Sequence, residues 1–353
     1  MEWKLSDEQI TYQETLRGWL SDTASAATVR AWLDEGDERT FEAQFVRDGW
    51  SGVGIPEALG GQGGGLVELA LTAEELARAA VPSAAWLATA LAVPALADRP
   101  DAAEKAFAGK AVTLLVPADE VPDSGPVLAM DSEGRLSGSV PRVLAGSRVD
   151  SFVAVVREGD HRAVRLVRAE DVEKSARRLL DRSRSVADVR LDAVPSEPLP
   201  VEGEAFLREY AARAAVLVAA DSLGAAERML ALAVDYSKQR RQFGVPIGSF
   251  QAVKHAAATI LVGTEAGRSV LYYAAATVDA GEPGCGLHAA AAKAQITAES
   301  ARAADSALTV HGAIGYTWEH DLHLFSKRAK LDEYLFGTPA QWNERIADGL
   351  RLV

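Results

Sequence analysis

The sequence predicts a mainly α-helical protein with a small β domain in the middle of the chain. Apolar residues recur at helical spacing up to about Arg99, β-rich runs separated by turn residues follow to about Leu199, and long alanine-rich helices return from Glu202. The expected domains are an N-terminal helical domain (1–110), a middle antiparallel β domain (111–200) and a C-terminal four-helix bundle (201–353).

The first helix begins at a recognisable signal. The string SDEQ, Ser6 to Gln9, has the spacing of a capping box and opens an amphipathic run. A glycine-rich stretch, 60–65, then separates this helical region from a second expected helix, Leu66 to Ala79. The stretch follows no convincing strand and lacks the Lys-Ser/Thr ending of a phosphate loop, so it predicts a flexible connection between helices.

Short apolar and β-branched runs predict the strands of the middle domain. They are Val112–Val116, Ser151–Val156, Ala163–Val167 and Asp188–Leu191. After Pro195 to Pro200 the apolar period returns to that of helices. The expected helices are Ala205–Arg240, Gln251–Ala280 and Leu287–Val310. Alanine-rich helices of this length pack closely and often build an oligomer core.

Charge and hydropathy exclude two classes of partner. The chain carries 37 Lys+Arg against 50 Asp+Glu, a formal net charge of -13, which works against binding a phosphate backbone. We therefore expect no nucleic-acid partner. The longest apolar stretch, Ala84 to Ala97, is interrupted by Thr89 and Pro94 and is shorter than the roughly 20 residues that a bilayer crossing needs. We expect a core helix there and no membrane span.

Cysteine and histidine usage predicts neither a disulfide nor a metal site. Cys285 is the single cysteine, which fits a reducing cytosol, and the opening MEWKLSDEQI is unlike a secretory signal. A cytoplasmic location is therefore expected. The six histidines include no HExxH motif, and His320 with His323 is their one close pair.

Three collinear strings carry a family resemblance. They are WSGVGIPEALGGQGGGLVELALTAEELARA from Trp50, RRQFGVPIGSFQAVKHAAA from Arg240 and HGAIGYTWEHDLHLFSKRAK from His311. With the order of helical, β and helical domains, they make the chain resemble the acyl-CoA dehydrogenase flavoproteins over nearly its whole length. In that family a carboxylate removes the α proton of an acyl thioester while a hydride leaves the β carbon for the flavin.

The resemblance implies FAD contacts at the C-terminal end of the first long helix and in the turn after the third. Arg240 matches the arginine that reaches across a subunit boundary to a neighbour's FAD, where a guanidinium suits a diphosphate. The remaining implied contacts are Gln242, Phe243, Gln251, Thr309, His311, Gly312, Gly315 and Thr338. Thr309 stands where the family usually has Gln, and Ala313 where it often has Gly, so the implied site is slightly weakened.

The other half of the family's site is missing. Leu144 occupies the place of a threonine that contacts the flavin ring, and Phe336 stands where most members have the catalytic Glu. A second family solution puts Glu on the helix at the position of Ala214. Neither residue can take a proton, so the resemblance implies no catalytic residue in this chain. The nearest carboxylates in sequence are Glu209, Asp332 and Glu333.

The expected function is that of a subunit in a heteromeric acyl-CoA dehydrogenase. The chain would contribute FAD contacts to a paralogue that owns the Glu base, in a heterotetramer sharing FAD across an interface. Two alternatives stay open: a self-sufficient enzyme in a homo-oligomer, whose base has moved to Glu333 or Glu209, and a scaffold without redox chemistry. The sequence identifies neither the acyl group nor the electron acceptor, which the resemblance suggests is an electron-transfer flavoprotein.

Overall fold

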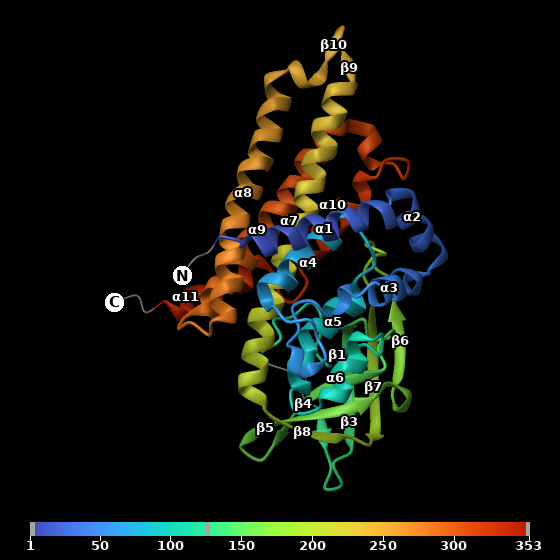
Figure 1. Ribbon diagram of the computed structural model, residues 1–353, viewed down its shortest axis with the longest axis vertical. Helices are drawn as coiled ribbons and strands as arrows, with labels where there is room; N and C mark the ends of the chain where they lie inside the picture. Colours follow the sequence, from blue (N-terminus) through green and yellow to red (C-terminus); the bar gives the residue numbers. More distant parts are fainter. Residues whose placement is uncertain (1–3, 124–127, 351–353) are drawn as a thin grey trace.

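The computed structural model describes residues 4–123 and 128–350 and confirms a mainly α-helical fold with a small β domain (Figure 1). The β sheets lie at one end of the molecule, and the N-terminal helices pack between them and the long C-terminal helices. No helix within these residues has both the length and the apolarity that crossing a membrane requires.

Six α-helices form the N-terminal part. They are α1 (Asp7–Thr23), α2 (Ala26–Glu35), α3 (Glu38–Arg47), α4 (Leu66–Arg78), α5 (Ala84–Ala92) and α6 (Pro100–Phe107), with 3-10 turns at Trp50–Gly52, Glu57–Leu59 and Val93–Leu96. The capping box at Ser6 is confirmed, since the Gln9 amide donates to Ser6 Oγ at 3.2 Å and the Ser6 amide donates to Gln9 Oε1 at 2.9 Å. The second predicted helix is confirmed as α4.

The glycine-rich stretch before α4 is packed, and the prediction of a flexible connection is wrong. The amides of Gly54 and Gly63 donate to the carbonyls of Gly63 and Ile55, each at 2.8 Å. A Cβ on Gly61 would collide with the Ile55 carbonyl oxygen. The glycines are therefore needed because two backbone segments approach closely.

Two four-stranded sheets form the β domain, in the orders β1-β4-β5-β8 and β2-β3-β7-β6. The strands are β1 (Val112–Leu114), β2 (Ala129–Met130), β3 (Leu136–Leu144), β4 (Ser151–Glu158), β5 (His161–Arg168), β6 (Glu173–Arg177), β7 (Val186–Val194) and β8 (Glu197–Glu202), with a 3-10 turn at Ala169–Asp171. The pairing of β1 with β4 is parallel, so the expectation of an antiparallel domain is wrong for that pair. The other pairs are antiparallel.

Long helices form the C-terminal part. They are α7 (Gly203–Gln239), α8 (Gln251–Asp279), α9 (Cys285–His311), α10 (Leu322–Asp332) and α11 (Pro339–Gly349), with a small hairpin of β9 (Arg241–Gln242) and β10 (Val245–Pro246) after α7 and 3-10 turns at Ile247–Ser249 and Gly312–Tyr316. The three predicted long helices are confirmed within two residues at each end. A Cβ on Gly224 would collide with the Glu74 carbonyl, so α4 crosses α7 in direct backbone contact.

A buried cluster of charged side chains lies where the three parts meet. Arg184, on the segment leading into β7, pairs with Asp221 on α7, and its Nη1 donates to Ser83 Oγ at 2.6 Å. Arg184 and Asp221 are 3% and 2% exposed. The ion pair therefore joins the β domain, the N-terminal helices and α7 away from solvent screening.

A second buried guanidinium extends this cluster to α10. Arg328 is fully buried, and it donates to the carbonyls of Leu76 at 3.2 Å and Val81 at 2.6 Å and to Ser183 Oγ at 2.6 Å. Its Nε lies 3.7 Å from a carboxylate oxygen of Asp181. Burial lowers the pKa of Arg328, and the neighbouring Arg184 lowers it further. The carboxylates must therefore stay in place for both arginines to be tolerated.

We predict that Asp221→Ala lowers the free energy of unfolding by about 3–5 kcal/mol, because it leaves a buried guanidinium without its partner. The measurement is urea unfolding followed by circular dichroism. Glu197→Ala is the control, since Glu197 pairs with Arg99 at 3.2 Å on the surface and its loss should cost less than about 1 kcal/mol. Equal losses in the two variants would contradict the importance of the cluster.

Candidate functional site

The C-terminal end of α7 and the β9–β10 hairpin form one tip of the molecule (Figure 1). The Arg240 amide donates to the Tyr236 carbonyl at 2.8 Å, and the Arg240 carbonyl accepts from the Ile247 amide at 2.8 Å. These backbone bonds fix the hairpin against the helix end. The Arg240 side chain is exposed and makes no ion pair with any residue between 4–123 or 128–350. It is therefore available to an anion from outside this chain.

The hairpin also presents a large apolar side chain to solvent. Phe243 is 91% exposed, and its ring lies 6.1 Å from that of Phe250 in an edge-to-face arrangement. Both Phe243 and Gly244 have positive φ angles, of 52° and 81°, which makes the turn tight. Gln242 and Gln251 are exposed beside it. A tip with this much uncovered aromatic surface is typical of a contact with another molecule.

The turn after α9 lies next to the same end of α7. The Tyr236 ring stacks on the His311 ring with centroids 4.7 Å apart and an angle of 24° between the planes. Arg240 lies one helical turn beyond Tyr236, so Tyr236 connects the end of α7 that carries Arg240 with the His311 turn. Thr309 lies on the last turn of α9, exposed, with its hydroxyl donating to the Asp305 carbonyl at 2.9 Å.

The two glycines of this turn have different surroundings. Gly312 has a φ of +65°, and a Cβ added to it would meet no atom within 4 Å. This leaves space for a ligand. A Cβ on Gly315 would lie 3.0 Å from the His311 Cβ and 3.3 Å from Leu322 Cδ2. Gly315 is therefore required by the packing of the turn itself.

The histidines near the turn pack against aromatic rings. The His311 ring lies 4.5 Å from that of His320, and the His323 ring lies 4.8 Å from that of Trp318. Burial lowers the pKa of His311 and of His320, and burial with Lys327 lowers the pKa of His323 to about 4. All three are therefore neutral near pH 7. No three potential metal-binding side chains gather anywhere in the part of the chain that the structure describes.

Thr338 lies apart from the other predicted FAD contacts. Its hydroxyl accepts from the Gln341 amide at 3.3 Å and caps α11. Figure 1 places α11 at the far end of α8 from the β9–β10 hairpin. The structure thus places Arg240, Gln242, Phe243 and Gln251 at one end of α7, which Tyr236 connects to the His311 turn, and it places Thr338 beside position 336 instead.

The place of the family's catalytic Glu is filled by an aromatic ring. Phe336 is 1% exposed, and its ring packs edge-to-face on Tyr210 of α7 with centroids 5.9 Å apart. Its amide donates to the Ala118 carbonyl at 2.6 Å, on the segment after β1. Leu144 is 2% exposed and Ala214 is fully buried. At the positions where the resemblance implies a flavin contact and a catalytic Glu, this chain therefore has buried apolar side chains, and the backbone at Phe336 is bonded to the segment after β1.

A buried lysine fixes the segment that carries Phe336. Lys293 on α9 donates from Nζ to the carbonyls of Asp332 and Gly337, each at 2.9 Å. Burial lowers the pKa of Lys293 to about 7, while the neighbouring Asp332 opposes that shift. A Cβ on Gly337 would lie 2.5 Å from Val121 Cγ2, so the segment has little room to move. Phe336 is therefore held in place from both sides.

The carboxylates closest in sequence to the position of Phe336 have different surroundings. Asp332 is fully buried, and its Oδ2 accepts from Ser222 Oγ at 3.3 Å. Burial and the nearby Asp221 raise the pKa of Asp332 well above its usual range, and the two buried arginines oppose this. Glu209 is exposed on α7, and Glu333 is half-buried after α10. None of the three occupies the position that Phe336 takes.

The hydrogen-bond donors at the α7 tip and the His311 turn suit an anionic cofactor, whereas the surroundings of Phe336 do not. The tip offers a free guanidinium, exposed amide side chains and an open glycine turn, which fit a diphosphate and an adenosine group. The interior around Phe336 is closely packed by apolar side chains, and the Tyr210 hydroxyl there is buried without a hydrogen-bond partner among the described residues. Sequence reasoning missed Tyr236 and Lys293. The spacing of Tyr236 four residues before Arg240 was a usable signal, because such residues share a helix face.

Comparisons with known proteins agree with the resemblance. The family description "Acyl-CoA dehydrogenase, N-terminal domain" matches residues 6–106, and "Acyl-CoA dehydrogenase, C-terminal domain" matches residues 203–350. Acyl-CoA dehydrogenase IpdE2 of Mycobacterium tuberculosis is 34% identical over 346 residues, which cover 96% of each chain. Acyl-CoA dehydrogenase FadE34 of the same organism is 34% identical over 358 residues, and the match covers 97% of this chain and 48% of FadE34.

A solved structure shares the fold over the whole chain. The ChsE4-ChsE5 complex from Mycobacterium tuberculosis is 25% identical in sequence, with a TM-score of 0.89 and coverage of 100% of both chains.

We predict that Phe336→Glu does not create an active enzyme. A carboxyl group there would be buried against Tyr210, and the nearby Lys293 ammonium already donates to the carbonyls of Asp332 and Gly337, so the variant should lose about 3 kcal/mol or more of unfolding free energy. Phe336→Leu is the matched control and should lose about 1 kcal/mol. Urea unfolding and an acyl-CoA dehydrogenation assay of each purified variant provide the measurements. A stable Phe336→Glu variant that turns over acyl-CoA alone would show that the site is complete apart from its base.

Proposed function

The chain belongs to the acyl-CoA dehydrogenase family, and we propose that it is the non-catalytic subunit of a heteromeric enzyme that desaturates an acyl-CoA thioester between its α and β carbons. The observation that carries this proposal is the contrast between two places in one molecule. The position of the base is occupied by the buried Phe336 ring, whereas Arg240 and its neighbours are exposed. An unlike subunit would supply the Glu and the contacts to the flavin ring.

The cofactor is proposed to lie at the interface between unlike chains. When bound, FAD accepts the hydride that leaves the β carbon of the acyl group. Arg240 would hold its diphosphate through a planar, permanently charged fork. Gln242, Phe243 and Gln251 would contact the adenosine part, and the turn from His311 to Gly315, with Thr309 before it, would lie against the pyrophosphate. Thr338, which caps α11, would support the Phe336 segment and not this contact.

The proposed partner is a paralogue of this chain in a heterotetramer. The ChsE4-ChsE5 structure is named as a complex of two chains, and one of its chains matches this chain from end to end. Electrons would leave the shared flavin for an electron-transfer flavoprotein. The proposed location of the assembly is the cytoplasm, in keeping with a chain that holds one cysteine.

The close packing around Phe336 also favours a second candidate function, that of a scaffold that has lost redox chemistry. Flavin binding distinguishes the scaffold from the non-catalytic subunit, because a scaffold should contribute no contact to FAD in any assembly. A self-sufficient enzyme with a relocated base is the third candidate. In that case the homomer should bind FAD, and Glu333→Gln or Glu209→Gln should abolish its activity.

We predict that the chain purified alone has no flavin absorbance and no acyl-CoA turnover. Co-expressed with a paralogue that carries the Glu base, it should yield one FAD for each pair of unlike chains. Absorbance spectra of the denatured complex, together with the mass of the native assembly, measure this ratio. Full flavin occupancy and dehydrogenation by the homomer would overturn the proposal.

We predict that Arg240→Ala weakens FAD retention in the heteromer by about tenfold to a hundredfold, as expected for the loss of a charged hydrogen-bonding partner. Arg208→Ala is the matched control, because Arg208 is also exposed on α7 but lies near its opposite end. Its FAD dissociation constant should stay unchanged. The measurement is a fluorescence titration of the apo-complex with FAD, and equal affinities for the two variants would favour the scaffold.

A further inference from the structure

A cavity of about 540 Å³ lies in the N-terminal part, between α3, α5 and the end of α6. This volume falls within the range of pockets that hold small organic ligands. The residues that line it include none of the predicted FAD contacts, and neither Phe336 nor Ala214. The cavity is therefore separate from both parts of the candidate site, and what it binds goes beyond the proposed function.

The walls of the cavity are aromatic and aliphatic. Phe41, Phe45, Ile55 and Phe107 are all less than a tenth exposed, and the Trp86 ring packs edge-to-face on Phe45 with centroids 6.4 Å apart. The buried Trp86 Nε1 has no hydrogen-bond partner among the residues that the structure describes. Such walls suit an apolar body, and the free indole N–H suits an oxygen on it.

Cations outnumber carboxylates among the lining residues. The cavity lining contains four cationic side chains and two carboxylates: Arg39, Arg47, Lys110 and Arg148, with Glu42 and Asp150. Three of the cations are already paired. Arg148 Nη2 lies 3.5 Å from Glu42 Oε2, Lys110 Nζ lies 3.2 Å from Asp150 Oδ1, and Arg47 Nε lies 3.3 Å from Asp48 Oδ1. Arg39 is therefore the lining cation that has no ion pair among the described residues, in a chain whose net charge is -13.

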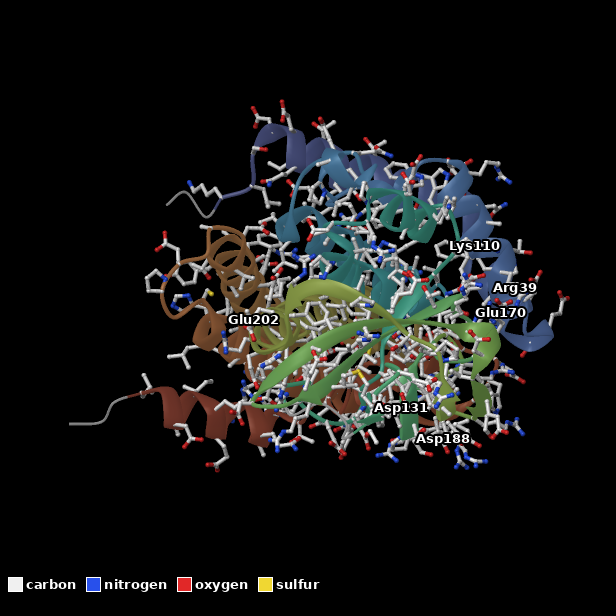
Figure 2. All side chains as sticks on the ribbon, turned by 90° about the horizontal axis from the view of Figure 1, so that it is seen from below. Arg39, Lys110, Asp131, Glu170, Asp188 and Glu202 are labelled. Atoms are coloured by element: carbon white, nitrogen blue, oxygen red, sulfur yellow. The ribbon has the colours of Figure 1, made fainter. Side chains whose placement is uncertain are left out.

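Arg39 is the cation best placed to receive a ligand. It is exposed on α3, and its guanidinium makes no ion pair or hydrogen bond with any of the described residues. Figure 2 shows Arg39 and Lys110 on the same side of the molecule, and both line the cavity. A guanidinium at the rim of an apolar cavity binds a carboxylate through two parallel hydrogen bonds.

We propose that this cavity binds a free apolar carboxylic acid, with its hydrocarbon body between α3 and α5 and its carboxylate at Arg39. The acid is a ligand of this subunit and not the substrate of the shared flavin site. Apolar burial supplies the affinity, and the cationic rim selects the ionised head group.

Isothermal titration calorimetry of the full chain with dodecanoate tests this proposal. Dodecanoate should bind with one site per chain, and dodecan-1-ol, which lacks the charge, should bind at least tenfold more weakly. Arg39→Gln should weaken dodecanoate at least fivefold and leave dodecan-1-ol unchanged. Lys174→Gln, which removes an exposed cation on β6, is the matched control and should bind dodecanoate like the parent chain.

A second variant tests the place of binding. Ala43 is exposed on α3 and lines the cavity, so Ala43→Trp should fill its mouth without disturbing the core and should abolish binding. Thermal unfolding of each variant checks that it folds. Dodecanoate binding unchanged in Ala43→Trp, equal affinity for acid and alcohol, or no binding to the parent chain would each overturn the proposal. None of these outcomes depends on flavin, so the function proposed above stands or fails separately.

Discussion

The architecture depends on keeping two buried guanidinium groups paired where the three parts of the chain meet. Arg184 and Arg328 can be buried because Asp221, the serines beside them and the carbonyls at the end of α4 take up their hydrogen bonds. The partners come from three parts of the sequence: the N-terminal helical region, the segment before β7, and α7. The β domain, the N-terminal helices and the bundle are therefore joined by directional contacts as well as by apolar packing, and their relative positions are closely defined.

This arrangement determines what the chain can do with a flavin. Asp332 at the end of α10 accepts from Ser222, the neighbour of Asp221, and Lys293 fixes the segment from Asp332 to Gly337. Phe336 is consequently held against Tyr210 and Ala118, where the family has its base. The tip of α7 has no such constraint, and its exposed groups can meet another chain. The interior serves stability, while the tip and the cavity beside α3 can serve binding.

Much of this was accessible from sequence. The long helices were predicted within two residues because their apolar period is clear, and the empty base position followed from Phe336 in the family's motif. The β domain was predicted less well. Strand β3 contains Gly138 and Pro141, and every residue of β6 is exposed, so neither shows the alternation that identifies a strand. The charged cluster could not be predicted, because the side-chain hydrogen bonds of Arg184 and Arg328 join residues that are 37 to 252 apart in the chain.

We propose that this chain no longer holds a flavin in its own interior and contributes contacts to the FAD of a neighbouring chain. A structure of the complex with a paralogue, solved with FAD bound, tests this most directly. We expect FAD at the interface, with the guanidinium of Arg240 on the diphosphate and the Phe336 amide still bonded to the Ala118 carbonyl in this chain. A flavin ring lying between the Ala118 segment and Phe336 of this chain would contradict it.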